Sequence, residues 1–300
     1  LLTAAALSHG YGVIIGKKPK VISAALNIRQ GIFLYKSHTD CHVSKYFSPL
    51  KEVGVSVVAL DEEGFVWPSG QQYVQARVKT GEVFEYLERA LAWGEVQVDW
   101  INDYLTDREV DDLTITGNAR FDLLRAPYNS VFNQAADSIR RQYGSFILIN
   151  GKFSSGNLAK FYGRSHIEKM DLSGRISSEV DRDFYLARQA YHELLLNSYI
   201  EAVRKLAVQF PSVSFVVRPH PSEERSTYIK AFKGFDNVFV NANGNVVPWL
   251  IAARAMIHTN CTTGIEAFLL GTPVLRYHPH YDERFESELR NSIGEGFTEY

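Results

Sequence analysis

The stretch AMIHTNCTTGIEAFLLGTPVL, residues 255–275, decides the fold of this chain. It reads as a short apolar strand, a polar turn, one helix and a second apolar strand. Ile265, Phe268 and Leu269 recur at positions i, i+3 and i+4, which predicts a single apolar helix face. Gly271 follows as the usual signal for the end of a helix. We therefore expect one strand–turn–helix–strand unit of a parallel sheet.

The turn of this unit, residues 260–264, joins the carboxyl end of a strand to the amino end of a helix. Backbone N–H groups and the positive end of the helix dipole meet there, and Thr262, Thr263 and Gly264 leave room and hydroxyl groups for an anion such as phosphate. Glu266 lies about one turn into the helix, where it can reach a hydroxyl beside that phosphate. An ordinary turn with a threonine cap is the alternative interpretation.

Apolar strands and amphipathic helices alternate along the rest of the chain. Strands are expected at 11–15, 31–35, 55–60, 92–93, 113–116, 145–150, 213–217, 238–240 and 274–277, and helices at 1–9, 22–28, 45–53, 82–91, 96–105, within 127–144, at 181–209, after 222 and at 247–253. This alternation implies parallel sheets covered on both faces. Residues 155–180 show no clear period and are interpreted as a loop or lid.

The polar stretch 127–144 separates two such series. We therefore expect an α/β, GT-B-like architecture of two Rossmann-like domains whose parallel sheets face each other across a cleft. The expected boundaries are residues 1–126, a domain that lacks its first strand, and residues 127–300. Because the chain starts without Met and both of its ends read as helix, we also expect a fragment.

Composition excludes several classes of protein. A net charge of −2 gives no electrostatic reason to expect nucleic acid as a partner. No apolar run has the length of a membrane span. Cys41 and Cys261 are far apart and outside any metal spacing, which favours a reduced, cytoplasmic protein without a metal.

Polar residues follow several of the expected strands. Arg218 and His220 each precede a proline, which forces both into extended conformation at the tip of a strand. A fixed imidazole beside an arginine suits binding of a phosphate, or protonation of a leaving phosphate. A proline-stiffened turn with a surface histidine is the alternative. Since the 260–264 turn is expected at the same sheet edge, we favour the functional interpretation.

The acidic run after the strand at 55–60 is a second candidate. Asp61 and Glu63, which should point the same way, are favoured over Glu62 as a general base or a carboxylate nucleophile for glycosyl transfer. An exposed acidic loop is the alternative.

Cations and amides at other strand ends complete the candidates. Asn118, Arg120 and Lys152 are placed to hold an anionic donor or acceptor, or else to pair with nearby acids. We interpret His258 as a packed histidine.

Three segments together carry a family resemblance: TGNARFDLL at 116–124, RPHP at 218–221, and residues 259–264 followed by GTPV at 271–274. In this order they resemble bacterial surface-carbohydrate biosynthesis proteins. Those proteins are similar to GT-B-fold glycosyltransferases, including the Kdo transferases of capsule and lipopolysaccharide synthesis, and to the CDP-glycerol glycerophosphotransferases. The resemblance implies a nucleotide donor held mainly by the second domain, an acceptor held by the first, and no metal.

The resemblance also implies roles for single residues. His220, Thr262 and Thr263 would contact the donor phosphate, Arg218 would assist, and Glu266 would lie near the ribose. The glycerophosphotransferases use an early His-Gly pair. His9 and Gly10 stand instead at the end of an expected helix, which favours a sugar transferase.

We therefore expect a metal-independent glycosyltransferase that moves a sugar from a nucleotide-activated donor, such as a CMP-Kdo-like one, to a glycan or lipid-linked acceptor. The expected location is cytoplasmic, with peripheral association at the inner face of the bacterial membrane compatible with it. No cofactor is expected beyond the nucleotide-sugar substrate. A CDP-glycerol-type transferase, a sugar-nucleotide epimerase and a non-catalytic nucleotide-binding subunit are the alternatives.

Overall fold

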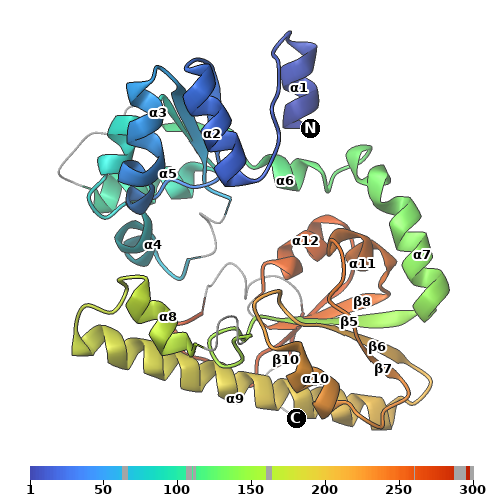
Figure 1. Ribbon diagram of the computed structural model, residues 1–300. Coiled ribbons are helices and arrows are strands. Elements are labelled where there is room, and N and C mark those ends of the chain that lie inside the picture. Colours follow the sequence, from blue (N-terminus) through green and yellow to red (C-terminus); the bar gives the residue numbers. More distant parts are fainter. Residues whose placement is uncertain are drawn as a thin grey trace. The chain divides into compact units, whose positions relative to one another are not determined.

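Two compact α/β units make up the chain, Leu1–Leu123 (unit 1) and Leu124–Tyr300 (unit 2). The computed structural model describes residues 1–62, 67–105, 110, 113–159, 164–259, 261–286 and 295–297. Figure 1 draws unit 1 from blue through cyan to the green of α6, and unit 2 from green to red. Each unit holds a parallel sheet, with strand order β1-β2-β3-β4 in unit 1 and β10-β9-β8-β5-β6-β7 in unit 2. Two parallel α/β sheets confirm the expected fold class.

Unit 1 alternates short strands and helices, as expected from its sequence. Its strands are β1 (Ile32–Tyr35), β2 (Ser56–Leu60), β3 (Arg89–Ala92) and β4 (Leu113–Ile115). Its helices are α1 (Leu2–Ser8), α2 (Lys18–Ile28), α3 (Ser48–Glu52), α4 (Gly70–Arg77), α5 (Glu95–Tyr104) and α6 (Ala119–Asp122), with helical turns η1 (Asp40–His42), η2 (Val43–Phe47) and η3 (Glu82–Tyr86).

Two predictions for unit 1 are wrong, and one helix was not predicted. Residues 11–15 form no strand, and Ile15 is 76% exposed. The helix expected at 82–91 is the turn η3 followed by β3, because the chain from Leu87 onward is extended and pairs with β2. Helix α4 was not predicted at all. Its Ser69 cap, whose side chain accepts from the N–H of Gln72, was the missed signal.

Unit 2 is the larger unit. Its strands are β5 (Phe146–Gly151), β6 (Ser214–Arg218), β7 (Val238–Val240), β8 (Ala255–Thr259), β9 (Val274–Tyr277) and β10 (Glu295–Phe297). Its helices are α7 (Asn133–Tyr143), α8 (His166–Leu172), α9 (Glu179–Gln209), α10 (Arg225–Ala231), α11 (Val247–Ala252) and α12 (Thr263–Leu269), and η4 (Tyr128–Phe132) is a helical turn.

Helices cover both faces of the unit 2 sheet (Figure 1). One apolar cluster joins α9 and α10 to one face, through residues such as Tyr199 and Ile149. The other joins α7, α11 and α12 to the opposite face, through residues such as Trp249 and Leu148. Alternate residues of β5 therefore enter different clusters, as expected for a buried central strand.

Three predictions for unit 2 are also wrong. Phe268 and Leu269 are 61% and 44% exposed, so they do not share a buried face with Ile265. The short α12 buries its first turn instead, including Glu266 and Ala267. The stretch 155–180 contains α8, whose capping box signals a helix start. Residues 295–297 form β10 beside β9 rather than a helix.

In the described part of the chain, no helix combines the length and apolar character needed to cross a bilayer.

Candidate functional site

The carboxyl edge of the unit 2 sheet carries a transverse row of polar side chains. The strand registers pair Arg218 with Asn150, Asn150 with His258, and His258 with Arg276. Paired residues of adjacent strands project from the same face of a sheet. Each of the four comes two residues after an apolar residue of the cluster that contacts α7, α11 and α12 (Leu148, Val216, Met256 and Val274), so the row lies on that face.

The turn between β8 and α12 is built on this row. The Nδ2–H of Asn150 donates to Thr263 Oγ1 over 3.2 Å, and Cys261 Sγ lies 3.0 Å from the same oxygen. A Cβ atom on Gly264 would stand 2.7 Å from Cε1 of His258. His258 is fully buried, which confirms that it is a packed histidine. Glycine is required at position 264 because the helix backbone lies directly on the imidazole ring.

The loop after β6 holds His220 in a defined orientation. The backbone N–H of Ser222 donates to Nδ1 of His220 over 3.2 Å, and the Ser222 hydroxyl lies 2.7 Å from Nδ1. The Ser222 hydroxyl also lies 2.7 Å from the hydroxyl of Ser154, which follows β5. Because Nδ1 accepts the backbone hydrogen bond, the neutral ring carries its proton on Nε2. His220 is half-buried at this strand tip, and its ring orientation is fixed by Ser222.

A buried carboxyl group ties the two loops together. Glu223 accepts from the N–H of Phe153 over 2.6 Å and from the hydroxyl of Tyr228. Burial raises the pKa of Glu223 to about 7, against the opposing effect of its hydrogen bonds and of the Lys152 charge. Lys152 also lowers the pKa of Cys261, which burial raises overall. The charge of Lys152 therefore acts on groups in both the loop after β6 and the loop after β8.

The structure corrects the expected role of Arg218. Its guanidinium donates to the carbonyls of Asn241, Asn243 and Gly244 over 3.0–3.1 Å and lies 4.7 Å from the ring centre of Trp249. Only 8% of Arg218 is exposed, and burial lowers its pKa to about 10. Arg218 holds the loop after β7 and is not presented to a phosphate.

Glu266 is also placed differently from expectation. It is 1% exposed, and its charge is felt by the buried Cys261. In this arrangement it is closed to a ribose hydroxyl. Thr262, by contrast, is half-buried, and its side chain makes no hydrogen bond among the described residues. Asn260 lies outside the described residues.

A buried polar cluster lies at the carboxyl ends of β1 and β2 in unit 1. Asp61 is 0% exposed and lies 3.5 Å from the guanidinium of Arg77. Arg77 also donates to Ser37, and the Nε2–H of buried His38 donates to the carbonyl of Ala59 over 2.8 Å. Burial is the main reason why the pKa of His38 is lowered. Asp61 is therefore not accessible to an acceptor hydroxyl, and Glu63 lies outside the described residues.

Asn118 and Arg120 belong to the same unit as Asp61. The side chain of Asn118 caps α6 by accepting from the N–H of Arg120 over 2.9 Å, and Asn118 is 6% exposed. Asn118 thus has a structural role at the start of α6. Both residues belong to unit 1, whereas Lys152 and His220 belong to unit 2.

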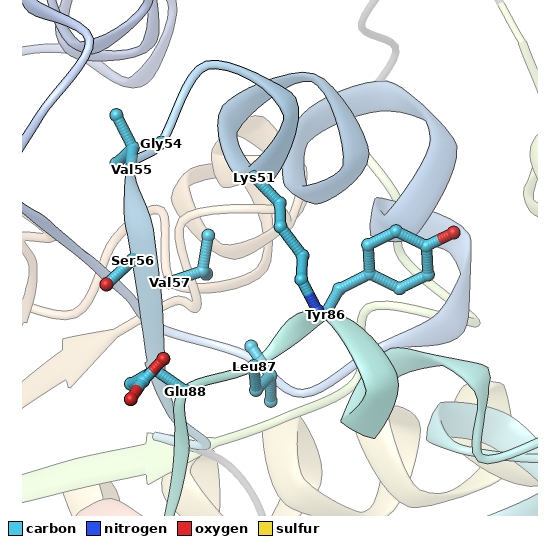
Figure 2. Close-up of a pocket in the computed structure, with 8 residues that line it drawn as sticks. All are labelled: Lys51, Gly54, Val55, Ser56, Val57, Tyr86, Leu87 and Glu88. Atoms are coloured by element: carbon cyan, nitrogen blue, oxygen red, sulfur yellow. The ribbon is translucent and has the colours of Figure 1, made fainter.

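A cavity lies at the opposite, amino-terminal end of the unit 1 sheet. Figure 2 shows this space of about 220 Å³ at the amino ends of β2 and β3. The ammonium of Lys51 on its wall already donates to the carbonyl of Glu85 over 2.6 Å. No group of three or more His, Cys, Asp or Glu side chains suited to a metal ion occurs among the described residues.

Several residues of the site escaped the sequence analysis. Ser222 and Glu223 directly follow the RPHP motif, so their position was a usable signal. Ser154 follows β5 in the same way. Arg77 gave no signal, because the helix that carries it was not predicted.

Comparisons with known proteins support the fold. No family model matches the sequence, and no curated protein matches it. The structure of UDP-GlcNAc 2-epimerase from Methanocaldococcus jannaschii is similar over 95% of this chain and 72% of that chain, with a TM-score of 0.54 and 9% identity. The wall teichoic acid polymerase TagF is similar over 84% of this chain and 54% of that chain, with a TM-score of 0.48 and 11% identity. Anabaena HepE in complex with UDP and glucose is similar over 93% of this chain and 67% of that chain, with a TM-score of 0.44 and 13% identity.

At these identities the likeness concerns the fold alone. The likeness to the epimerase, together with two parallel sheets, gives the chain a GT-B-like fold.

Proposed function

We propose that this chain is a GT-B glycosyltransferase that binds a nucleotide-activated sugar at the carboxyl edge of the unit 2 sheet. The observation that carries the proposal is the position of His220, a half-buried imidazole at a strand tip whose Nδ1 is held by the backbone N–H of Ser222. Lys152 and Thr262 stand at neighbouring strand ends, where ligands of parallel sheets collect. The acceptor is proposed to be a bacterial surface glycan, held by unit 1.

The proposed chemistry uses these groups against the charge that develops on the leaving phosphate. As the bond between the sugar carbon and the phosphate oxygen breaks, Nε2–H of His220 and the ammonium of Lys152 stabilise the departing oxygen. The acceptor hydroxyl must lose a proton to a base. Since Asp61 is sealed by Arg77, the proposed base moves to Glu62 or Glu63.

Substitution of His220 by alanine tests this role. Loss of a general acid lowers turnover by about 10²–10⁴-fold, so the variant should lose donor turnover with its melting temperature nearly unchanged. His9→Ala, at the exposed end of α1, is the control and should keep full activity. Near wild-type turnover in His220→Ala would remove His220 from the mechanism. Metal independence belongs to the proposal, so turnover should persist in EDTA.

The nucleotide can be identified by thermal shift with CMP, CDP, UDP, GDP and ADP. A ligand present at 100 times its dissociation constant adds about 2.7 kcal/mol of stability, which is readily measured. CMP would support a Kdo-like donor, and CDP followed by turnover of CDP-glycerol would support glycerophosphate transfer. Nucleotide binding without turnover of any donor would support a non-catalytic subunit.

A second candidate function is sugar-nucleotide epimerisation. It is favoured by one observation, the likeness in fold to an enzyme named as a UDP-GlcNAc 2-epimerase. An epimerase converts its sugar nucleotide without an acceptor, whereas a transferase requires one. Incubation with UDP-GlcNAc alone, followed by NMR of the sugar, separates the two functions.

A further inference from the structure

A cavity of unit 2 lies between the segment after β5 and the helices α8 and α9. Its volume is about 500 Å³, which is within the range of small-molecule pockets. The side chains that matter below are Ser155, Leu158, Arg164, His166, Glu168 and Gln189, all of which line it. A Cβ atom on Gly156 would stand 2.5 Å from the backbone nitrogen of Glu193. The segment after β5 therefore lies directly on the backbone of α9, which fixes one wall of the cavity.

The same wall is joined to the loop that carries His220. Leu158 and Glu223 form an antiparallel bridge, flanked by two backbone hydrogen bonds of 2.9 Å between residues 157–159 and 222–224. The segment that lines the cavity and the loop after β6 are therefore one hydrogen-bonded structure. A ligand in this cavity would lie against the segment that holds the His220 loop.

The ionised side chains of this lining balance each other. Arg164 carries one positive charge. Hydrogen bonds to Ser165, and then the charge of Arg164, lower the pKa of Glu168, which is therefore ionised at pH 7. Burial, and then neighbouring cationic side chains, lower the pKa of His166 to about 4, so its ring is neutral at pH 7. The described lining thus has no net charge and gives an anion no electrostatic advantage.

Hydrogen-bonding groups of both kinds remain open in the lining. Ser155 is only 6% exposed, and its hydroxyl makes no hydrogen bond with the residues that the structure describes. The amide of Gln189 donates to Glu193 over 2.9 Å, which leaves its carbonyl oxygen as an acceptor. Glu168 accepts from the N–H of Ser165 over 2.6 Å, and a carboxylate has lone pairs for further bonds.

A neutral ligand with several hydroxyl groups matches this lining best. Each hydroxyl both donates and accepts, as a hydroxyl beside a carboxylate and an amide oxygen requires. A phosphate or a sugar carboxylate only accepts, and it would be repelled by Glu168. An apolar ligand would leave the buried hydroxyl of Ser155 unsatisfied. Leu158 supplies an apolar surface for the C–H groups of a ring.

We propose that this cavity binds a neutral sugar ring through hydrogen bonds to Ser155, Glu168 and Gln189. The proposal deepens the proposed function, because it assigns the substrate to the neutral sugars and excludes acidic sugars of the Kdo type. It rests on that function only for the source of the sugar, which is the nucleotide-activated donor or the acceptor glycan.

Saturation-transfer NMR with glucose and glucuronate tests the sugar and its charge. These two ligands share a ring and differ in one carboxylate. Wild type should bind glucose, and it should bind glucuronate at least about tenfold more weakly, because the Glu168 carboxylate repels a second one. Equal binding of the two sugars, or binding of neither, would overturn the proposal.

Glu168→Gln isolates the effect of the charge. Glutamine can serve in a capping box as glutamate does, so α8 should keep its start. The preference for glucose over glucuronate should fall by about threefold or more. Glu179→Gln makes the same exchange in the first turn of α9 and is the control, which should keep the full preference. An undiminished preference in Glu168→Gln, or an equal fall in Glu179→Gln, would contradict the proposal.

Ser155→Ala isolates one hydrogen bond to the sugar. Glucose should bind about threefold to tenfold more weakly, because the hydroxyl that meets it is lost. Since this hydroxyl has no partner within the described residues, the melting temperature without ligand should stay unchanged. Ser138→Ala, on an exposed part of α7, is the control. The assignment of the cavity fails if Ser155→Ala binds glucose as wild type does, or if both variants lose the same affinity.

UDP-glucose and GDP-mannose, each compared with its nucleoside diphosphate, identify the source of the sugar. If a nucleotide sugar binds more tightly than its diphosphate and Ser155→Ala loses this gain, the sugar is that of the donor. If the gain is absent and glucose still binds beside the nucleotide, the sugar is that of the acceptor. Nucleotide binding without any sugar binding would refute the sugar cavity and leave the nucleotide site standing. Sugar binding without nucleotide binding would support the cavity and refute the proposed function.

Discussion

The carboxyl edges of the two sheets resemble each other in sequence but differ in how deeply their polar residues are buried. Both place polar residues directly after buried strands. In unit 1, Asp61 is paired with Arg77 and fully buried. In unit 2, His220 and Thr262 stay half-buried above a packed floor that includes His258 and Gly264. Position at a strand end thus selects candidates, and burial decides which of them can meet a ligand.

The largest effect is expected from breaking the buried pair of Asp61 and Arg77 in unit 1. Asp61→Ala leaves Arg77 without its carboxylate and should reduce the free energy of unfolding by about 3 kcal/mol, measured by urea denaturation. Asp137→Ala removes an exposed pair with Arg140 at 3.0 Å and should change stability by less than about 0.5 kcal/mol. If Asp61→Ala kept wild-type stability but lost activity, Asp61 would be a catalytic group, and the two edges would not differ in this way.

The next effect concerns Glu223, the buried carboxyl group that joins the loops after β5 and β6 in unit 2. The pKa of Glu223 is raised from 4.5 to about 7, so the folded state keeps a proton that the unfolded state releases. Its contribution to stability is full below pH 4.5 and is lost as the pH rises toward 7. The size of this pH-dependent contribution is about 3 kcal/mol.

Glu223→Gln should therefore flatten the decline in stability between pH 4.5 and 7, because the amide accepts from Phe153 without titrating. Denaturation of both proteins at several pH values measures the difference. Parallel curves for the two proteins would show that Glu223 does not titrate in this range.

A smaller effect on stability is expected where the backbone at Gly264 packs on the His258 ring. Gly264→Ala places a methyl group 2.7 Å from the His258 ring and should destabilise unit 2 by about 1–3 kcal/mol through overpacking. Gly12→Ala, where nothing lies within 4 Å, is the control. A neutral Gly264→Ala would mean that α12 can move away from β8.

The smallest effect is expected at Ser222. Ser222→Ala removes the 2.7 Å contact of the hydroxyl with His220 Nδ1 but keeps the backbone N–H donor that fixes the tautomer. One hydrogen bond accounts for about 0.5–1.5 kcal/mol, so turnover should fall by about threefold to tenfold. If turnover fell as far as in His220→Ala, the Ser222 hydroxyl, rather than its backbone N–H, would be the group that orients the imidazole.

Prediction from sequence succeeded where the signal is local. The strands at 145–150, 213–217 and 238–240 and the helix at 181–209 lie within one or two residues of their predicted bounds. The apolar face expected for α12 failed, because the periodicity of Phe268 and Leu269 does not reveal which side of a short helix finds a partner. The roles of Arg218 and Glu266 failed for the same reason, since their surroundings come from distant segments.

The sequence by itself determined the alternation of strands and helices, the parallel sheets and the positions where polar residues leave the strands. Periods of two and of about 3.6 residues, with caps and prolines, are properties of neighbouring residues. Only the tertiary structure decided that Asn150 donates to Thr263, 113 residues away, and that Glu223 joins two loops. Burial and pairing depend on the register between strands and on helix packing, which no local pattern encodes.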